Sequence, residues 1–160
     1  MEWDWILIGL MAVAALSLAT WADIISNTRS DLLSAGFILF LSWPLASVVD
    51  LIFTPPESML IAPITDALFV SWLLYSLRRQ YEAWKVMLIG LVATQAFLHV
   101  AYQVGHYQPH MLYFYVVALN STYALQLLVV GIVGGRNVLS HYRLSGVRGL
   151  RPLCIPDGHK

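Results

Sequence analysis

The sequence predicts an all-α integral membrane protein, a bundle of five transmembrane helices with its N-terminus outside and its C-terminus in the cytoplasm. Of its 160 residues, 59% are hydrophobic and only 11% are charged, whereas soluble domains have about 25% charged residues. Five apolar stretches approach the roughly 20 residues that a helix needs to cross the hydrocarbon core. The basic residues fall in alternate connections between those stretches, which is typical of a polytopic membrane protein.

Short polar or turn-forming segments separate the expected spans. The first span follows two acidic residues and no base, whereas a cleaved signal peptide has a positive start, so we expect a retained helix. Asn27 to Arg29 interrupts the apolar run before the second span, and Thr54 to Glu57 suits a tight hairpin in which threonine caps the next helix. The spans are about residues 5–22, 32–53, 59–77, 86–104 and 111–133.

Pro63 lies inside the third expected span. We interpret this span as a kinked helix, because neighbouring helices can satisfy the carbonyl that proline frees. The alternative is a segment that begins as an extended or re-entrant piece. Pro44 in the second span is interpreted in the same way as Pro63.

The fourth span carries a polar stripe. Gln95, His99 and Gln103 recur at intervals of four, which places them on one face of a helix. Polar groups in a bilayer must face protein or water, so this face cannot contact lipid. Gly105 and Pro109 then separate the fourth span from the fifth.

Gly131 and Gly135, at the end of the fifth span, have the Gly-x-x-x-Gly spacing of closely packed membrane helices. Two interpretations stay open, packing within one chain and a dimer interface. A ridge of small residues on the first span fits either of them. The ridge consists of Gly9, Ala12, Ala15 and Ala19.

The basic residues define the predicted topology. All nine fall on one side of the membrane if five spans alternate in direction, and the other side has only acidic charges. The positive-inside rule then places the N-terminus outside and the C-terminus in the cytoplasm, in a bacterial-type cytoplasmic (inner) membrane. The nine are Arg29, Arg78, Arg79, Lys85, Arg136, Arg143, Arg148, Arg151 and Lys160.

Polar side chains from four expected spans lie at similar depth. At about 1.5 Å per residue from the outer end of each span, Asp50 is about 5 Å deep, His99 about 8 Å and Asp66 about 10 Å, while Gln95 and Asn120 are about 14 Å deep. Such a cluster either holds helices together by hydrogen bonds or handles protons or a solute. The cluster is Asp50, Asp66, Gln95, His99, Gln103 and Asn120.

The residue types that enzymes and metal sites use form no recognisable pattern. The sole cysteine, Cys154, cannot close an intramolecular disulfide, and His106 and His110 lack an acid or cysteine to complete a metal site. A haem would need a second axial ligand opposite His99. The net charge is zero, so the chain lacks the excess of basic residues that is typical of a nucleic-acid-binding protein. We therefore expect no catalysis, cofactor, bound metal or nucleic-acid partner.

The segment 134–160 is predicted to be a basic cytoplasmic tail. Its glycine and proline content opposes a long helix, and its arginines favour anionic lipid headgroups, at about 1 kcal/mol each when they lie close to the membrane. A protein partner and a simple topology signal are the alternatives. The arginines are Arg136, Arg143, Arg148 and Arg151.

The leading functional hypothesis is a non-catalytic accessory or structural subunit that packs against a larger membrane assembly, its partner another membrane protein or a second copy of the chain. It follows from apolar helices, small-residue ridges and the lack of a catalytic set. The first alternative is a small oligomeric transporter or channel that uses Asp66, His99 and the row Gln95 and Gln103 for a proton or solute. A holin-like pore former is the second alternative.

Overall fold

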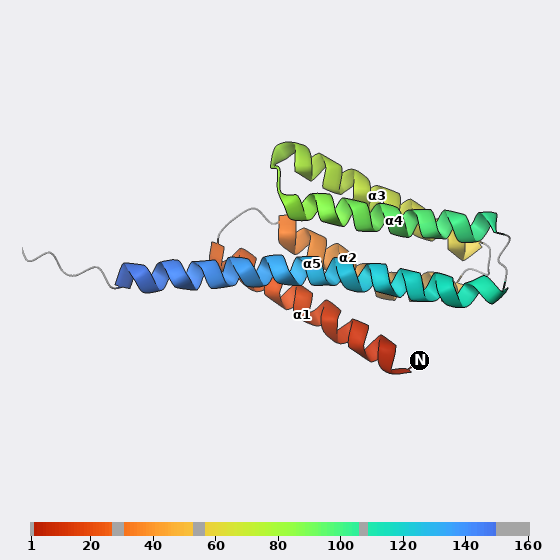
Figure 1. Ribbon diagram of the computed structural model, residues 1–160, viewed down its shortest axis with the longest axis horizontal. Coiled ribbons are helices and arrows are strands. Elements are labelled where there is room, and N and C mark those ends of the chain that lie inside the picture. Colours follow the sequence, from red (N-terminus) through yellow and green to blue (C-terminus); the bar gives the residue numbers. More distant parts are fainter. Residues whose placement is uncertain (1, 27–30, 53–56, 106–108, 150–160) are drawn as a thin grey trace, which may run out of the picture.

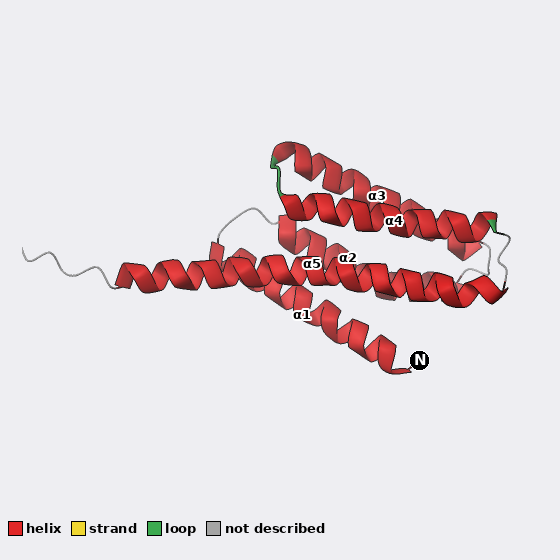
Figure 2. Cartoon of the chain, in the orientation of Figure 1, coloured by secondary structure: helices red, strands yellow, loops and turns green. Residues whose placement is uncertain are grey.

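The computed structural model describes residues 2–26, 31–52, 57–105 and 109–149, with side chains for residues 8–24, 31–42, 61–105 and 111–143. These residues are helical apart from short turns, so the predicted all-α class is confirmed (Figure 2). The expected break at 27–29 and the turn residues 54–56 lie outside the described residues. The elements are α1 (Glu2–Ser26), α2 (Asp31–Ile52), α3 (Glu57–Arg79), α4 (Ala83–Val104) and α5 (Pro109–Gly149).

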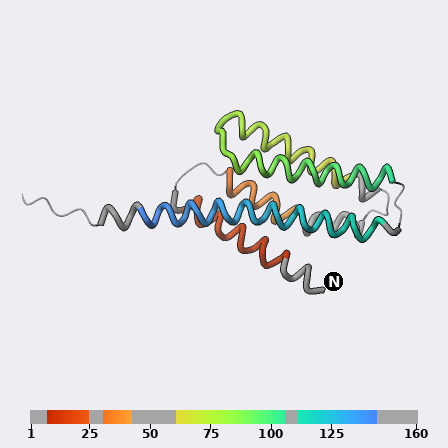
Figure 3. The backbone as a smooth tube through the Cα atoms, viewed as in Figure 1, coloured from red at the N-terminus to blue at the C-terminus, as the bar shows by residue number. Residues whose placement is uncertain are grey.

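Successive helices run in opposite directions. α1, α3 and α5 run toward the end of the molecule that holds the α3–α4 turn, and α2 and α4 run back (Figures 1 and 3). α5 packs against α1, α2 and α4, while α3 packs against α4 and α2. This is the up-and-down connectivity that short connections impose on a helical bundle.

The basic side chains that the structure describes lie at one end of this bundle. Arg78 and Arg79 end α3, and Lys85 lies in the first turn of α4. Arg136 and Arg143 belong to the C-terminal part of α5, which extends past the α3–α4 turn on the same side (Figure 1). The described basic residues of alternate connections are thus gathered at one end of the fold.

Within the residues whose side chains the structure describes, two helices are long and apolar enough to cross a membrane, Ala83–Val104 and Met111–Arg143. The described apolar segments of α1 and α2, Ile8–Ile24 and Asp31–Ser42, are shorter. α3 carries Asp66 in its interior and arginines at its end, and these residues lower its hydropathy. The five predicted helices are therefore present, and, as far as the side chains are described, two of them have the length and composition of a membrane span.

α5 corrects the predicted end of the fifth helix. The expectation that glycine density opposes a long helix after residue 133 is wrong for residues 134–149, because α5 continues without a break to Gly149. Each glycine costs a helix only about 1 kcal/mol relative to alanine, and Gly134 is buried against α1. At about 1.5 Å per residue its 41 residues span about 60 Å, roughly twice the thickness of a bilayer core.

α3 is a continuous helix that contains Pro63. The helical interpretation of the third predicted span is therefore confirmed, and the extended or re-entrant alternative is not found. α2 likewise continues through Pro44. Proline is tolerated inside apolar helices where neighbouring groups satisfy the freed backbone carbonyl.

Small residues bring α1 and α5 together. The buried positions of α1 recur every three or four residues, the spacing of one helix face. A Cβ on Gly131 would lie 4.0 Å from Ala15 Cα, and one on Gly134 would lie 3.0 Å from the carbonyl atoms of Leu18. Because both partners advance by three residues, the two helices are parallel and in close contact. The buried face of α1 consists of Ile8, Ala12, Ala15, Ala19 and Ala22.

Candidate functional site

The central pair of the site is Asp66 and His99. Asp66 Oδ2 lies 3.6 Å from His99 Nε2, and the two side chains are 14% and 9% exposed. Asp66 shares an inward stripe of α3 with Phe69 and Leu73, which are both buried. The predicted proximity of these two titratable groups is therefore present across the α3–α4 contact.

His99 also contacts α5. Its Nδ1 lies 2.6 Å from the Tyr115 hydroxyl, so both ring nitrogens of the imidazole face a polar group. The Tyr115 ring stacks on Tyr102, with centroids 4.2 Å apart and planes 9° apart. Tyr115 was not predicted, because its hydroxyl sits near the start of an apolar helix where tyrosine also fits a simple interfacial position.

A second polar contact joins α4 to α5. Gln126 Nε2 donates a hydrogen bond of 2.8 Å to Gln95 Oε1, and the Gln126 side chain is buried. Gln95 lies one helical turn from His99, so the two contacts follow the same side of α4. Gln126 was missed by the sequence analysis, although a glutamine inside an apolar run is the signal that selected Gln95.

The remaining predicted polar residues are less closely joined to the pair. Gln103 is half-buried one turn beyond His99, and Asn120 is half-buried on α5. Among the residues with described side chains, no hydrogen bond links Asn120 to Asp66 or His99. The side chain of Asp50 lies outside the described residues.

Of the two glycines in the predicted Gly-x-x-x-Gly motif, only one packs against another described helix. Gly131 faces α1, whereas a Cβ on Gly135 would meet no atom of the described residues within 4 Å. Gly134, which was not predicted, makes the tight contact instead. Arg136 and Arg143 are exposed on α5, and the side chains of Arg148 and Arg151 lie outside the described residues.

A charged network occupies the basic end of the bundle. Lys85 is fully buried, and its Nζ lies 2.7 Å from Asp31 Oδ2 and 3.0 Å from Glu82 Oε2. It also donates to the Gln80 carbonyl, and Ser76 Oγ donates a 2.6 Å hydrogen bond to Asp31 Oδ2. The sequence analysis counted Lys85 only as a topology charge. Its position three residues before the buried Leu88, on the inward stripe of α4, is the signal that was overlooked.

An apolar layer separates the Lys85 network from the Asp66–His99 pair. Leu73, Leu88 and Val92 are at most 1% exposed and lie between the two polar regions along α3 and α4. From Lys85 to His99 the rise along α4 is about 21 Å. Among the side chains that the structure describes, the polar groups on the two sides of this layer are therefore not joined into one continuous path.

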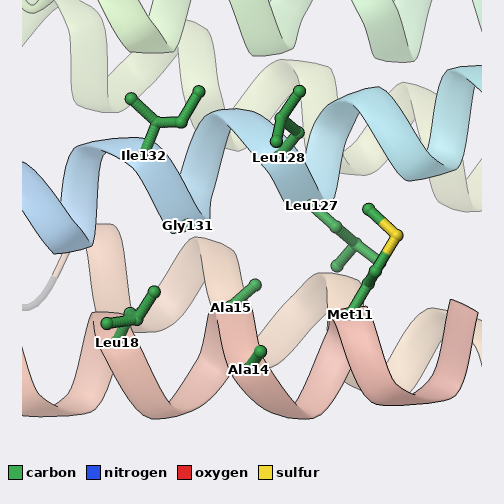
Figure 4. A pocket seen from close by; sticks show the side chains of 8 residues that line it. All are labelled: Met11, Ala14, Ala15, Leu18, Leu127, Leu128, Gly131 and Ile132. Carbon is green, nitrogen blue, oxygen red and sulfur yellow. The ribbon is translucent and has the colours of Figure 1, made fainter. Parts of the chain in front are cut away.

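An open apolar groove of about 250 Å³ lies between α1 and α5 (Figure 4). Its floor includes small residues, and the longer side chains of both helices form its walls. It lies on the opposite side of α5 from α3 and α4 (Figures 1 and 4). The lining residues are Met11, Ala14, Ala15, Leu18, Leu127, Leu128, Gly131 and Ile132.

In the part of the chain that the structure describes, no group of three or more His, Cys, Asp or Glu residues is placed to hold a metal ion. Comparison with protein-family models, curated proteins and solved structures finds no match for this chain.

Proposed function

We propose that the chain is a non-catalytic polytopic membrane protein that serves as an accessory or structural subunit of a larger membrane assembly. In this proposal all five helices cross a bacterial-type cytoplasmic membrane, with the N-terminus outside and the C-terminus inside. The collection of described basic side chains at one end of the bundle supports this orientation.

The observation that carries the structural role is the pairing of buried polar groups between different helices. Lys85 joins α4 to Asp31 of α2, and Gln126 of α5 joins Gln95 of α4. The Tyr123 hydroxyl of α5 donates to the Leu39 carbonyl of α2. Such contacts hold apolar helices together, at about 0.6–2 kcal/mol each. The apolar layer between the polar regions favours this role over a continuous pathway for ions.

The part of α5 beyond the bundle supports an association with a partner or with lipid headgroups. Leu139 and Tyr142 are 65% and 55% exposed, and Arg136 and Arg143 are exposed beside them. Cations near the membrane surface attract anionic lipids, and exposed apolar side chains on the same segment favour a contact surface.

Topology is tested with the single cysteine of the chain. Cys154 should react with a membrane-impermeant maleimide only after the membrane is opened. A cysteine introduced by Gln108→Cys, in a background with Cys154→Ser, should react in intact cells. Reaction of both positions in intact cells, or of neither, would contradict a membrane crossing by the fifth helix, which lies between them.

The structural role is tested by Asp66→Asn and His99→Gln. We expect both variants to lower the melting temperature of the purified chain, with Asp23→Asn on α1 as a control remote from the pair. Native gels of membrane extracts should show the wild-type chain in an assembly larger than itself. A chain found only as a monomer would contradict the subunit proposal.

A small proton-handling transporter is the second candidate, and the contact between the titratable groups of Asp66 and His99 favours it. Reconstituted vesicles with an internal pH-sensitive dye separate the two functions. A saturable proton flux that both variants abolish, without loss of folding, would replace the structural proposal with transport.

A further inference from the structure

Asp66, His99 and Tyr115 form a chain of contacts across three helices. We propose that they constitute a binding site for one proton, and that loss of this proton reverses the hydrogen bond between His99 and Tyr115. The proposal goes beyond the structural role given above, and it does not require protons to cross a membrane.

The geometry places a proton-exchanging group at each ring nitrogen of His99. Asp66 Oδ2 lies 3.6 Å from Nε2, and the Tyr115 hydroxyl lies 2.6 Å from Nδ1. Oδ2 is buried and has no hydrogen-bond partner among the described residues. An isolated buried carboxylate charge is costly, so the site favours states in which the carboxyl and the imidazole together are neutral.

With the proton bound, two arrangements have this neutral total. Either Asp66 is an uncharged acid whose O–H faces Nε2, or its carboxylate faces an imidazolium N–H. In both arrangements Nδ1 carries a hydrogen and donates it to the Tyr115 oxygen. The direction of the α4–α5 hydrogen bond is therefore the same in both occupied forms.

Loss of the proton to a base in solution leaves the Asp66 carboxylate beside a neutral imidazole. The one ring hydrogen that stays is stabilised on Nε2, where it faces the carboxylate. Nδ1 then becomes an acceptor, and the Tyr115 hydroxyl must donate to it. The site thus couples a change of charge at the α3–α4 contact to the direction of the hydrogen bond between α4 and α5.

The surroundings of the site isolate this titration. Tyr102 stacks on the Tyr115 ring from α4, and Gln95 and Gln103, one turn before and one turn after His99 on α4, are uncharged amides. Lys85 on α4 is about 21 Å away along the helix, and it is paired with Asp31 of α2 at 2.7 Å. Arg78 lies at that same end of α3, while the side chain of Asp50 lies outside the described residues.

The test follows both partners at once by nuclear magnetic resonance. The full chain, with isotope-labelled histidine and tyrosine rings, is placed in phosphatidylcholine nanodiscs and measured over a series of pH values. His99→Gln and Tyr115→Phe assign the two signals by their loss. Tyr113, exposed on α5, and His141, on the projecting part of the same helix, serve as controls.

We expect His99 to change from a form with hydrogen on Nδ1 to the Nε2–H tautomer in one step as the pH rises. The ring signal of Tyr115 should move with the same midpoint, while that of Tyr113 should not follow it. Asp66→Asn should move the histidine midpoint to lower pH by about one unit or more, because the imidazolium loses its counter-charge.

Three results would each overturn the proposal. The first is a His99 that keeps one protonation state over the whole pH range in which the chain stays folded. The second is a Tyr115 signal that does not move with His99, and the third is a histidine midpoint that Asp66→Asn leaves unchanged. The first two use the wild-type chain, so the proposal stays testable if Asp66→Asn fails to fold.

Discussion

Replacement of Gly134 by alanine tests the close packing of α1 on α5. A Cβ at this position would lie 3.0 Å from the carbonyl carbon and oxygen of Leu18 and 3.2 Å from the Ala19 nitrogen. These are backbone atoms, so no flexible side chain can move aside. Carbon atoms in contact prefer separations of at least about 3.5 Å, and the two helices would have to separate by about 0.5 Å.

The neighbouring glycine supplies a matched control. A Cβ on Gly135 would have no described atom within 4 Å, yet the substitution adds the same methyl group to the same helix. Because the gain in helix propensity is the same for both variants, their difference isolates the steric term. Overpacking of a close contact costs about 1–3 kcal/mol, so Gly134→Ala should be less stable than Gly135→Ala by about that amount.

The assay is the unfolding of the purified full chain in mixed micelles with increasing denaturing detergent, followed by helical circular dichroism. Gly135→Ala is expected to match or exceed the wild-type stability, and Gly134→Ala to fall below it. If Gly134→Ala were as stable as Gly135→Ala, the parallel contact of α1 with this part of α5 would be refuted.

Two further substitutions probe the buried polar contacts. Lys85→Met leaves two carboxylates without their cation and should destabilise the fold by about 2–3 kcal/mol. This is somewhat less than for a fully buried pair, because both carboxylates are partly exposed. As a control, Arg79→Met replaces an exposed cation and should cost at most about 1 kcal/mol in the same unfolding assay. A double-mutant cycle of Gln95→Leu and Gln126→Leu should give a coupling energy of about 0.6–2 kcal/mol, and additive effects would show that the hydrogen bond contributes nothing.

Helix number and most helix ends were predictable from local sequence. The expected spans 32–53 and 86–104 correspond closely to α2 (Asp31–Ile52) and α4 (Ala83–Val104). An apolar run between turn-forming residues is a local signal, because an apolar helix satisfies its own backbone groups. The end of α5 was predicted too early, which shows the limit of such signals. Gly134, one of the glycines that argued against a helix, is buried against α1.

The candidate site was predictable only in part. An aspartate and a histidine inside apolar stretches marked Asp66 and His99 as residues that must face protein, and the structure places them in contact. Tyr115 and Lys85 carried weaker signals, because tyrosine and lysine near a helix end also fit ordinary interfacial positions. Their roles became visible only when the inward face of each helix was known.

The sequence by itself determined the helical class, the apolar character and the placement of the basic residues in alternate connections, because each depends on the composition and order of neighbouring residues. The tertiary structure decided which polar side chains contact one another. Gln126 and Gln95 are 31 residues apart, and Lys85 and Asp31 are 54 apart. Such contacts depend on the rotation and relative shift of whole helices, which the packing of small and large side chains between them determines.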